Sequence, residues 1–297
     1  MKIKTQEISL PLLEEKKVRL FIKRIDQIHE CVSGNKWYKL KYNFIEAKRK
    51  GFASILTFGG AFSNHIVATA NMAKLKGFSS VGIIRGEKHL PLNSSLSFAV
   101  EQGMRIYYVS RRDYRLKDTV GFLNKLEEKF GNFYLIPEGG TNKLAIKGTE
   151  EILDLNDTQD YICCAVGTGG TIAGIINSSN ESQKVIGFPV IKGFDKLEKD
   201  ILNWVNKRNY YFLNDYFCGG YARLNDVLIH VINNFYRTQN IPLDAVYTGK
   251  MMLGILDLVA KDHFPKGSSV LAIHTGGIQG NKGMNNRFGL HLPVALK

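Results

Sequence analysis

Residues 33–42 read SGNKWYKLKY, and the rest of the chain is best interpreted from this segment. Its first three residues, Ser33 to Asn35, combine turn and N-cap chemistry, because short polar side chains accept hydrogen bonds from free backbone N–H groups. From Trp37 onward, apolar side chains recur at the spacing of a buried helix stripe. That stripe continues through Leu40, Phe44 and Ala47. The segment therefore predicts the start of a buried helix.

Two lysines one helical turn apart lie on a different face of this predicted helix. Lys36 falls in the first turn, where the helix end already carries partial positive charge, and Lys39 adds like-charge repulsion. Both effects favour loss of a proton from Lys36, and a neutral lysine amine can form a Schiff base with a carbonyl. A basic helix start on the protein surface would show the same residues, so this segment alone favours the simpler interpretation.

The composition is that of an ordinary globular protein. The chain has 297 residues, of which 44% are apolar and 23% charged, and it exceeds the usual size of one simple domain. The net charge of +13 and the pI near 9.5 suit anionic small molecules, nucleic acid or solubility alone. Because the lysines and arginines are scattered along the chain, nucleic-acid binding is only a minor hypothesis.

Cysteine usage and the N-terminus indicate a soluble protein of a reducing compartment. Four cysteines occur, none in a CxxC pair: Cys31, Cys163, Cys164 and Cys218. We expect no disulfide scaffold at this chain length. The N-terminal segment lacks the apolar core of a signal peptide, and no apolar run is long enough to span a bilayer. The expected location is the cytoplasm, without a membrane partner.

Predicted strands alternate with predicted helices, which is typical of parallel sheets with right-handed crossovers. The predicted strands are 18–25, 53–58, 79–84, 105–110, 133–136, 161–166, 184–188, 210–213 and 269–273. After the opening helix, the predicted helices are 66–76, 96–102, 114–130, 144–155, 172–177, 196–206, 224–238 and 249–261. Residues 276–289 are expected to form a glycine- and asparagine-rich loop. The loop Pro137–Asn142 is a candidate for the return crossing between two domains.

A glycine run, GTGGT at residues 167–171, follows the apolar strand YICCAV and precedes a helix. Free backbone N–H groups and the positive helix end converge there, which predicts an anion site with phosphate as the usual occupant. The run is not a Rossmann fingerprint, because Ile172 stands at the third glycine position. It is not a P-loop either, because no GK[ST] follows. A tight strand–helix turn without any ligand is the alternative.

A second strand-to-helix junction, FGGAFSNH at residues 58–65, carries reactive side chains. Ser63 is a candidate reactive side chain, but at a helix start an N-cap role is the leading interpretation. The nucleophile-elbow pattern GxSxG is absent, which disfavours a serine hydrolase. His65 lies too close to Ser63 along the helix for a direct relay, and a structural role is the alternative.

Two tyrosines and one strand end complete the candidate set. Tyr221 and Tyr247 stand near glycine-rich turns, although phenols at the edge of a core would look the same. The segment LAIHTGG, residues 271–277, ends a strand in polar and glycine residues, where ligands bind in open α/β sheets. Zinc-ligand spacings such as HExxH are missing, so no metal site is predicted.

Six segments together resemble one family. They are SGNKWYKLKY, GGAFSNH, IPEGGTN, AVGTGGTIAG, VYTGK and HTGG, in an order and spacing similar to the aminocyclopropane-carboxylate deaminase and D-cysteine desulfhydrase family. The resemblance runs from about residue 10 to about residue 280 and implies a pyridoxal-phosphate enzyme of the tryptophan-synthase β-subunit fold. It further implies two three-layer α/β/α domains with mainly parallel sheets and the cofactor in the cleft between them. The expected domains are 1–46 with 137–297 and an inserted 47–136, in a homodimer.

The resemblance also implies roles for the cofactor-binding residues. Lys36 looks like the Schiff-base lysine, and Asn64 looks like the residue that holds the ring oxygen. Lys39 adds charge near the phosphate. The phosphate cradle corresponds to the backbone of Gly167, Thr168, Gly169, Gly170 and Thr171.

On the substrate side, the resemblance assigns carboxylate binding and proton shuttling to Ser63 and His65, with Asn64 and Thr275 as further substrate contacts. Tyr221 and Tyr247 match the two active-site tyrosines. Thr248 matches the residue that faces the pyridine nitrogen.

The residue facing the ring nitrogen guides the choice of reaction. Ring-opening deaminases resemble a pattern with Glu after the tyrosine, whereas desulfhydrases resemble the threonine pattern found at Thr248. A neutral partner gives a weaker electron sink, which is adequate for β-elimination. We therefore expect D-cysteine or a related β-substituted amino acid as substrate. The alternatives are cyclopropane ring opening, racemisation or dehydration on the same cofactor, and a non-catalytic phosphate-ligand or nucleic-acid binder.

Two departures from the family pattern bear on the substrate pocket. The chain is shorter than typical members, with a brief connection after the strand at 184–188. Glu138 stands in a loop that is usually apolar in the relatives. Both changes affect the choice of substrate rather than the choice of cofactor.

Overall fold

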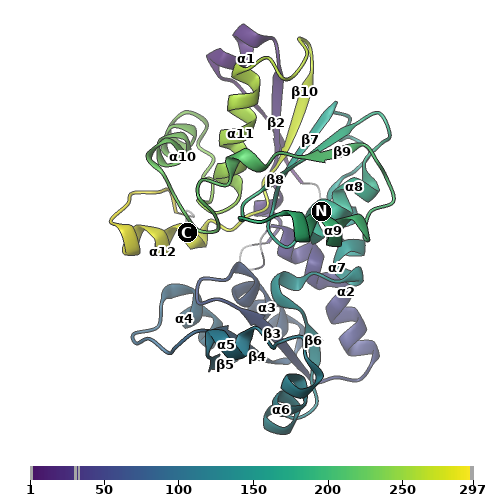
Figure 1. The fold of residues 1–297 in the computed structure, drawn as a ribbon, viewed down its shortest axis with the longest axis vertical. Coiled ribbons are helices and arrows are strands. Elements are labelled where there is room, and N and C mark those ends of the chain that lie inside the picture. Colours follow the sequence, from purple (N-terminus) through teal and green to yellow (C-terminus); the bar gives the residue numbers. More distant parts are fainter. Residues whose placement is uncertain (1–2, 30–31, 33, 295–297) are drawn as a thin grey trace.

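Two β-sheets organise the chain into two lobes in the computed structural model, which describes residues 3–29, 32 and 34–294 (Figure 1). The upper lobe holds a six-stranded sheet and the lower lobe a four-stranded sheet. Both sheets are mainly parallel, which confirms the predicted α/β class. The strands of the lower sheet all lie between Ser54 and Ile136. The predicted domain limits at 46/47 and 136/137 stay a prediction.

The upper sheet has the strand order β1-β2-β10-β7-β8-β9. Neighbouring strands are parallel except for β1 and β2, which are antiparallel. The sequence did not predict β1, because its four residues include a single buried one and show no apolar alternation. The strands are β1 (Thr5–Ile8), β2 (Arg19–Lys23), β10 (Ser269–Ile273), β7 (Tyr161–Val166), β8 (Lys184–Pro189) and β9 (Tyr210–Phe212).

Helices cover both faces of the upper sheet. One face carries α1 (Pro11–Lys16), α10 (Asp226–Gln239) and α11 (Thr248–Ala260), and the other carries α8 (Gly170–Ser178) and α9 (Asp195–Leu202). Side chains alternate along a strand, so Cys163 packs into the first core and Cys164 into the second. Both cysteines are fully buried, in keeping with their interpretation as small apolar residues.

The lower sheet has the order β5-β4-β3-β6, and all of its pairs are parallel. Its strands are β5 (Met104–Val109), β4 (Ser79–Arg85), β3 (Ser54–Gly59) and β6 (Tyr134–Ile136). Helices α3 (Asn64–Lys76) and α4 (Ser94–Glu101) pack on one face. Helices α5 (Arg111–Tyr114) and α6 (Val120–Phe130) pack on the other.

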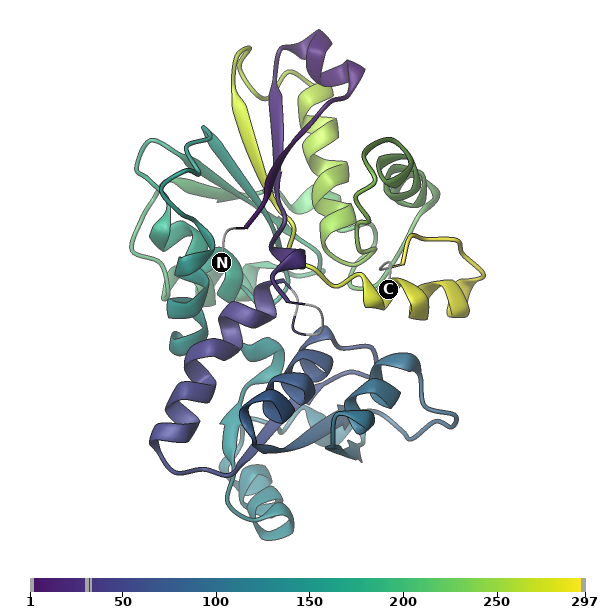
Figure 2. The same ribbon diagram turned by 180° about the vertical axis from the view of Figure 1, so that it is seen from behind.

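Helix α2 (Asn35–Arg49) joins the two lobes. Tyr38 belongs to a core of the upper lobe, whereas Leu40 and Phe44 belong to a core of the lower lobe. Figure 2 shows α2 descending from the junction of the lobes along the side of the lower one. The lysines in its first two turns are thereby placed between the two sheets.

The predicted loop at residues 276–289 was wrong, because Gln279–Phe288 form helix α12. Asparagine is a weak helix former, so the local sequence gave no helix signal. Tertiary hydrogen bonds supply the missing stability: Asn281 accepts from the N–H of Ala245 at 3.0 Å and donates to the carbonyl of Leu243 at 2.9 Å.

Three predicted helices were too long, and the one predicted over 196–206 ends at Leu202 as α9. Of the segment 114–130, only Val120–Phe130 form a long helix, α6, because α5 ends at Tyr114 and the chain turns before Val120, where the hydroxyl of Thr119 donates to the carbonyl of Leu116 at 2.7 Å. The helix predicted over 144–155 is α7 (Lys143–Thr149), followed by a 3-10 turn over Glu150–Ile152. The hydroxyl of Thr149 donates to the carbonyl of Gly170 at 2.9 Å, which ties the end of α7 to α8.

Cysteines 163, 164 and 218 carry free thiols. Cys31 and Ser33 lie outside the described residues. Within the described ranges, no helix combines the length and the apolar character needed to cross a bilayer. The same ranges contain no group of three or more His, Cys, Asp or Glu side chains arranged to hold a metal ion.

Candidate active site

Helix α2 begins beside the loop that follows strand β10. Gly34 precedes the helix with a positive φ of 66°, and the N–H of Asn35 donates to the carbonyl of Thr275 at 3.2 Å. The side-chain amide of Asn35 donates to Thr171 Oγ1 at 2.8 Å. The backbone that carries Lys36 is thus tied both to the loop after β10 and to the glycine run before α8.

Lys36 lies partly buried in the first turn of α2 and lines a narrow cavity between the lobes. Asn64, Thr275, Gly277 and Gln279 also line this cavity. Burial lowers the pKa of Lys36 from 10.5 to about 8, because desolvation disfavours the charged amine. A substantial share of the amine is therefore neutral at slightly alkaline pH.

Lys39 is buried one turn further along α2 and is only 1% exposed. Its pKa lies well below the ordinary value, first because of burial and then because of the charge of Lys36. The predicted repulsion therefore acts on Lys39, whereas burial lowers the pKa of Lys36. The Nζ atom of Lys39 donates to three oxygens: Thr141 Oγ1 at 2.8 Å, the carbonyl of Gly139 at 3.1 Å and Thr168 Oγ1 at 3.2 Å.

The glycine run at residues 167–171 connects β7 with α8, as predicted from the sequence. Gly169 is the N-cap of α8, with a φ of +80°, and no side chain caps the helix. The first N–H groups of α8 therefore have no partner within the helix, and the helix end adds partial positive charge. With Lys39 beside Thr168, these groups fit the phosphate of the pyridoxal phosphate expected from the sequence.

The start of helix α3 faces the same cavity. Ser63 is its N-cap, and Ser63 Oγ accepts from the N–H of Ile66 at 3.4 Å, so the N-cap role is realised. Asn64 Oδ1 accepts from Gln279 Nε2 at 2.7 Å. Gly277 leaves the room that this pair needs, since a Cβ there would lie 2.6 Å from Asn64 Nδ2. Asn64 is therefore positioned from both lobes.

His65 lies behind the cavity rather than among the residues that line it. The residue is 2% exposed, and its Nε2 lies 2.7 Å from Thr57 Oγ1. Thr57 donates its only hydroxyl proton to the carbonyl of Ile136, so His65 Nε2 carries the hydrogen in this pair. Burial, followed by the charges of Lys36 and Lys39, holds the pKa of His65 well below its ordinary value. His65 is therefore neutral near pH 7.

The two predicted tyrosines lie beside each other, next to the glycine run. Tyr247 Oη lies 3.5 Å from Tyr221 Oη, and their ring centroids are 6.1 Å apart. Tyr247 packs against the glycine run, because a Cβ on Gly167 would lie 2.8 Å from its ring. Burial raises the pKa of Tyr221 and raises that of Tyr247 well above its ordinary value. Both phenols therefore carry their protons at neutral pH.

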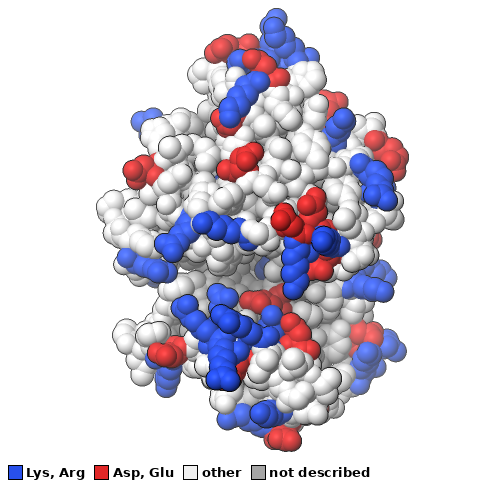
Figure 3. Space-filling view, in the orientation of Figure 1, with Lys and Arg blue, Asp and Glu red and all other residues white. Residues whose placement is uncertain are grey.

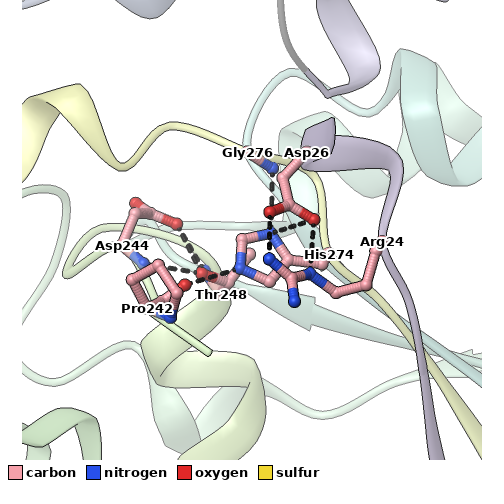
Figure 4. Close-up of polar contacts among 7 residues, drawn as sticks. All are labelled: Arg24, Asp26, Pro242, Asp244, Thr248, His274 and Gly276. Atoms are coloured by element: carbon pink, nitrogen blue, oxygen red, sulfur yellow. Dashed lines mark hydrogen bonds and ion pairs between the residues drawn. The ribbon is translucent and has the colours of Figure 1, made fainter. Parts of the chain in front are cut away.

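Thr248 is fully buried at the start of α11, and Asp244 engages its hydroxyl. Thr248 Oγ1 donates to Asp244 Oδ1 and accepts from the N–H of Asp244, both at 2.8 Å. Asp244 Oδ2 accepts from the N–H groups of Val246 and Tyr247 at 2.9 and 3.0 Å. Both carboxylate oxygens are thus occupied by donors at or just before the start of the helix, and Figure 4 shows the contacts between Asp244 and Thr248.

A buried histidine connects this turn to the loop after β10. His274 Nε2 lies 2.7 Å from the carbonyl of Pro242, and the N–H of Gly276 donates to Nδ1 at 3.3 Å. Asp26 Oδ1 lies 3.5 Å from the same Nδ1, and two hydrogen bonds of 2.8 Å join Asp26 to Arg24 (Figure 4). This network fixes the backbone on either side of Thr275.

Sequence reasoning missed four polar residues that hold the site together: Asn35, Thr141, Asp244 and Gln279. Asn35 stands in the SGNKWYKLKY segment and Thr141 in the IPEGGTN segment, so these motifs could have pointed to both residues. Asp244 stands four residues before Thr248 and accepts from the first N–H groups of α11, a pattern typical of helix starts. Gln279 gave no signal, because its helix was predicted as a loop.

The molecular surface is hollowed between the lobes (Figure 3). Lys and Arg side chains gather on the lower edge of this hollow, over the region of α5. Arg111 and Arg112 of α5 are exposed. A positive rim attracts anions and raises their local concentration. The charge distribution therefore suits an anionic cofactor and a substrate carboxylate.

The chain is similar to known proteins over almost its whole length. Residues 3–276 match the family described as "Pyridoxal-phosphate dependent enzyme". A protein of Thermotoga maritima named "Putative 1-aminocyclopropane-1-carboxylate deaminase" is 34% identical over 292 residues, which cover 91% of this chain and 92% of that protein. An Arabidopsis thaliana protein named as a bifunctional D-cysteine desulfhydrase/1-aminocyclopropane-1-carboxylate deaminase is 31% identical, with coverage of 88% and 73%.

Solved structures of other proteins have a similar fold. The crystal structure of an ACC deaminase homologue superposes with a TM-score of 0.81 at 27% identity, covering 97% of this chain and 93% of that one. A hydrogen sulfide-producing enzyme from Fusobacterium nucleatum gives a TM-score of 0.66 at 14% identity, with 93% and 95% coverage. The second likeness shows the fold alone.

Proposed function

This chain belongs to the pyridoxal-phosphate dependent enzymes, within the ACC deaminase and D-cysteine desulfhydrase family, and on that premise we propose that it converts D-cysteine to pyruvate, sulfide and ammonia. Its cofactor is pyridoxal phosphate. When bound, the cofactor supplies an electron sink for the negative charge that develops at the substrate α-carbon. The residues of the chain hold the cofactor, bind the amino acid and move its protons.

The state of Thr248 is the observation that carries the choice of elimination. Its hydroxyl is neutral, and both oxygens of the neighbouring Asp244 are occupied by N–H and O–H donors. This segment therefore offers no free carboxylate to a ring nitrogen. A weaker electron sink is adequate when the α-carbanion expels an adjacent leaving group at once, as in β-elimination.

Lys36 has the chemistry of both anchor and base. Its amine would hold the cofactor when the cofactor is bound, and once free it would act on the substrate as a base. The freed amine, with a pKa of about 8, is matched to taking the α-proton near neutral pH. Loss of that proton and of hydrosulfide leaves an aminoacrylate, and water converts this product to pyruvate and ammonia.

The start of helix α3 is proposed to bind the substrate carboxylate. Ser63 caps the helix, and the N–H groups of Asn64 and His65 follow in its first turn. The first N–H groups of a helix have no partner within it and attract an anion. Thr275, across the cavity, is proposed to contact the substrate as well.

Tyr221 and Tyr247 are proposed as proton donors to the leaving group. Their pKa values are raised, so both phenols are protonated at neutral pH and are poor bases there. Elimination needs a base at the α-carbon and a donor for the departing sulfur, and Lys36 and the tyrosine pair supply one each.

Product analysis tests the proposed reaction. The protein loaded with pyridoxal phosphate is incubated separately with D-cysteine, D-serine and 1-aminocyclopropane-1-carboxylate, and sulfide, keto acids and serine enantiomers are measured. We expect sulfide and pyruvate from D-cysteine in equal amounts. Formation of 2-oxobutyrate from the cyclopropane amino acid without sulfide from D-cysteine would favour ring opening, which the names of the relatives support. Conversion of D-serine to L-serine alone would favour racemisation.

A non-catalytic phosphate-ligand or nucleic-acid binder is the remaining alternative. It predicts a protein that stays colourless when incubated with pyridoxal phosphate.

We also propose that the protein is a homodimer in the cytoplasm. Light scattering on the purified protein measures the oligomeric state, and fractionation of the source cells tests the cytoplasmic location.

Replacing Lys39 by methionine is expected to weaken cofactor binding about 10- to 100-fold, because a hydrogen bond from a charged donor contributes roughly 1.5–3 kcal/mol. The substitution removes the Nζ donor beside Thr141 and Thr168 while keeping the apolar stem. Fluorescence titration of the apoprotein with pyridoxal phosphate measures the dissociation constant. Lys41→Met, on the same helix but with a side chain 40% exposed and paired with Glu151, is the matched control and should change the dissociation constant less than about twofold. Equal dissociation constants for both variants would contradict a role of Lys39 in binding the phosphate.

A further inference from the structure

The loop that presents Tyr221 has an unfavourable backbone conformation. Four of its residues have positive φ angles: Cys218 at 50°, Gly219 at 83°, Gly220 at 123° and Ala222 at 54°. Residues other than glycine adopt this region at a cost in free energy, and such conformations persist only where the surrounding structure holds them. Tyr221 itself is 50% exposed, so packing of its side chain supplies only part of that restraint.

A buried lysine on helix α11 binds this loop. Lys250 is fully buried, and its Nζ donates to the carbonyl of Phe217 at 2.8 Å and to the carbonyl of Gly220 at 2.7 Å. These two carbonyls stand at either end of the Cys218–Gly220 turn, and the second belongs to the residue directly before Tyr221. One ammonium group therefore fixes the turn at both ends.

The position of Lys250 is costly for a cation. It lies in the first turn of α11, where the helix end carries partial positive charge. Among the described residues, no ion pair includes Lys250, so carbonyl dipoles hold its charge. Burial of an unpaired charge destabilises a fold unless hydrogen bonds compensate it. The carbonyls of Phe217 and Gly220 provide that compensation.

The same helix also carries the second tyrosine of the site. Tyr247 directly precedes α11, and Lys250 follows it by three residues. A second tether joins helix and loop, because Tyr216 Oη donates to Asp257 Oδ2 at 2.6 Å. Helix α11 therefore sets the position of both phenols, one through its own backbone and the other through Lys250.

We propose that Lys250 is a positioning residue that holds the 217–222 turn, and so places the Tyr221 hydroxyl opposite that of Tyr247 for proton transfer. The role in catalysis rests on the proposed β-elimination, whereas the role in ordering the turn does not. Lys250 acts through backbone carbonyls and has no contact with substrate or cofactor in this proposal.

Hydrogen exchange followed by mass spectrometry tests the ordering of the turn in the whole protein. In Lys250→Met, amide exchange in residues 217–222 is expected to accelerate about tenfold, while the strands β7 and β10 keep their protection. Lys250→Gln retains an N–H donor, so its exchange rate in residues 217–222 should lie between those of Lys250→Met and the natural protein. It also serves as the test protein if Lys250→Met does not fold. Lys74→Met, exposed on α3, is the control and should leave exchange in the turn unchanged.

A double-mutant cycle tests the path through Tyr221. Lys250→Met is expected to lower kcat on D-cysteine about tenfold with little change in KM, and to lower it less than about threefold when Tyr221→Phe is already present. Unchanged exchange in residues 217–222 would overturn the ordering role. An equal loss of kcat from Lys250→Met in the natural protein and in Tyr221→Phe would show that Lys250 does not act through Tyr221. If the natural protein releases no sulfide from D-cysteine, the proposed reaction fails, and the exchange experiment still decides the role of Lys250.

Discussion

Lys36→Ala is expected to abolish covalent attachment of the cofactor and to lower activity at least about 10³-fold, because the amine is both the proposed anchor and the proposed base. The side chain lines a cavity together with Asn64 and Thr275, and among the described residues no other lysine lines that cavity. Lys39, one turn away, donates instead to Gly139, Thr141 and Thr168.

Mass spectrometry after borohydride reduction measures the attachment. The natural protein loaded with cofactor should gain the mass of one reduced pyridoxal phosphate on the peptide that contains Lys36, and Lys36→Ala should gain none. Lys74→Met, an exposed lysine of α3, should label and react like the natural protein. Labelling of another lysine in the natural protein, or activity of Lys36→Ala within tenfold of normal, would contradict the assignment.

The low pKa of Lys36 also predicts a pH dependence of stability in the apoprotein. Folding lowers this pKa from 10.5 to about 8, so the unfolded chain holds the proton more tightly between these two values. Stability rises with pH wherever the unfolded state binds more protons, so the Lys36 contribution should become less unfavourable from pH 8 to pH 10.5. Denaturant unfolding of the natural apoprotein and Lys36→Met at a series of pH values isolates this contribution as their difference.

Gly34→Ala is expected to destabilise the fold by about 3 kcal/mol or more and to displace Lys36. The φ of Gly34 is +66°, and an added Cβ would overlap the carbonyl oxygen of Thr275 and lie 2.5 Å from its carbonyl carbon. Both obstacles are backbone atoms, so no side chain can rotate away. The hydrogen bond from Asn35 to Thr275 would have to break or lengthen to make room.

Gly51→Ala is the matched control for this substitution. Gly51 has a similar φ of +74°, but an added Cβ there meets nothing within 4 Å. It should therefore show the conformational cost alone, about 1 kcal/mol, with normal cofactor binding. Thermal unfolding with and without pyridoxal phosphate measures both effects. A Gly34→Ala protein as stable as Gly51→Ala would show that the α2 start tolerates a shift away from Thr275.

Much of the site could be predicted from the sequence because its parts are local. A strand that runs into GTGGT and a helix places free N–H groups at one point whatever the rest of the fold does, and Ser63 caps α3 for the same local reason. The two lysines of α2 are one turn apart by helix geometry alone. These features depend on backbone conformation over a few residues, which short motifs specify.

Other features depended on contacts between distant segments. The pKa of Lys36 is low because two lobes enclose it, and the sequence suggested repulsion from Lys39 instead. Asp244 occupies the hydroxyl of Thr248, and Lys250 reaches the carbonyls of a turn about 30 residues earlier in the chain. Helix α12 forms because Asn281 bonds to the segment that precedes α11.

The sequence by itself determined the α/β class, since apolar periodicity acts over a few residues, and its motifs pointed to the cofactor family through their resemblance to known enzymes. Lys36 as the anchor and the glycine run as the phosphate cradle stay predictions. Only the tertiary structure decided how deeply Lys36 is buried, that His65 lies behind the cavity, and which groups hold Thr248 and Tyr221. Desolvation and hydrogen bonds between distant residues exist only once the lobes have packed, so no local pattern encodes them. The segment SGNKWYKLKY marks the position of the amine, and its packing between the two sheets sets the pKa of that amine.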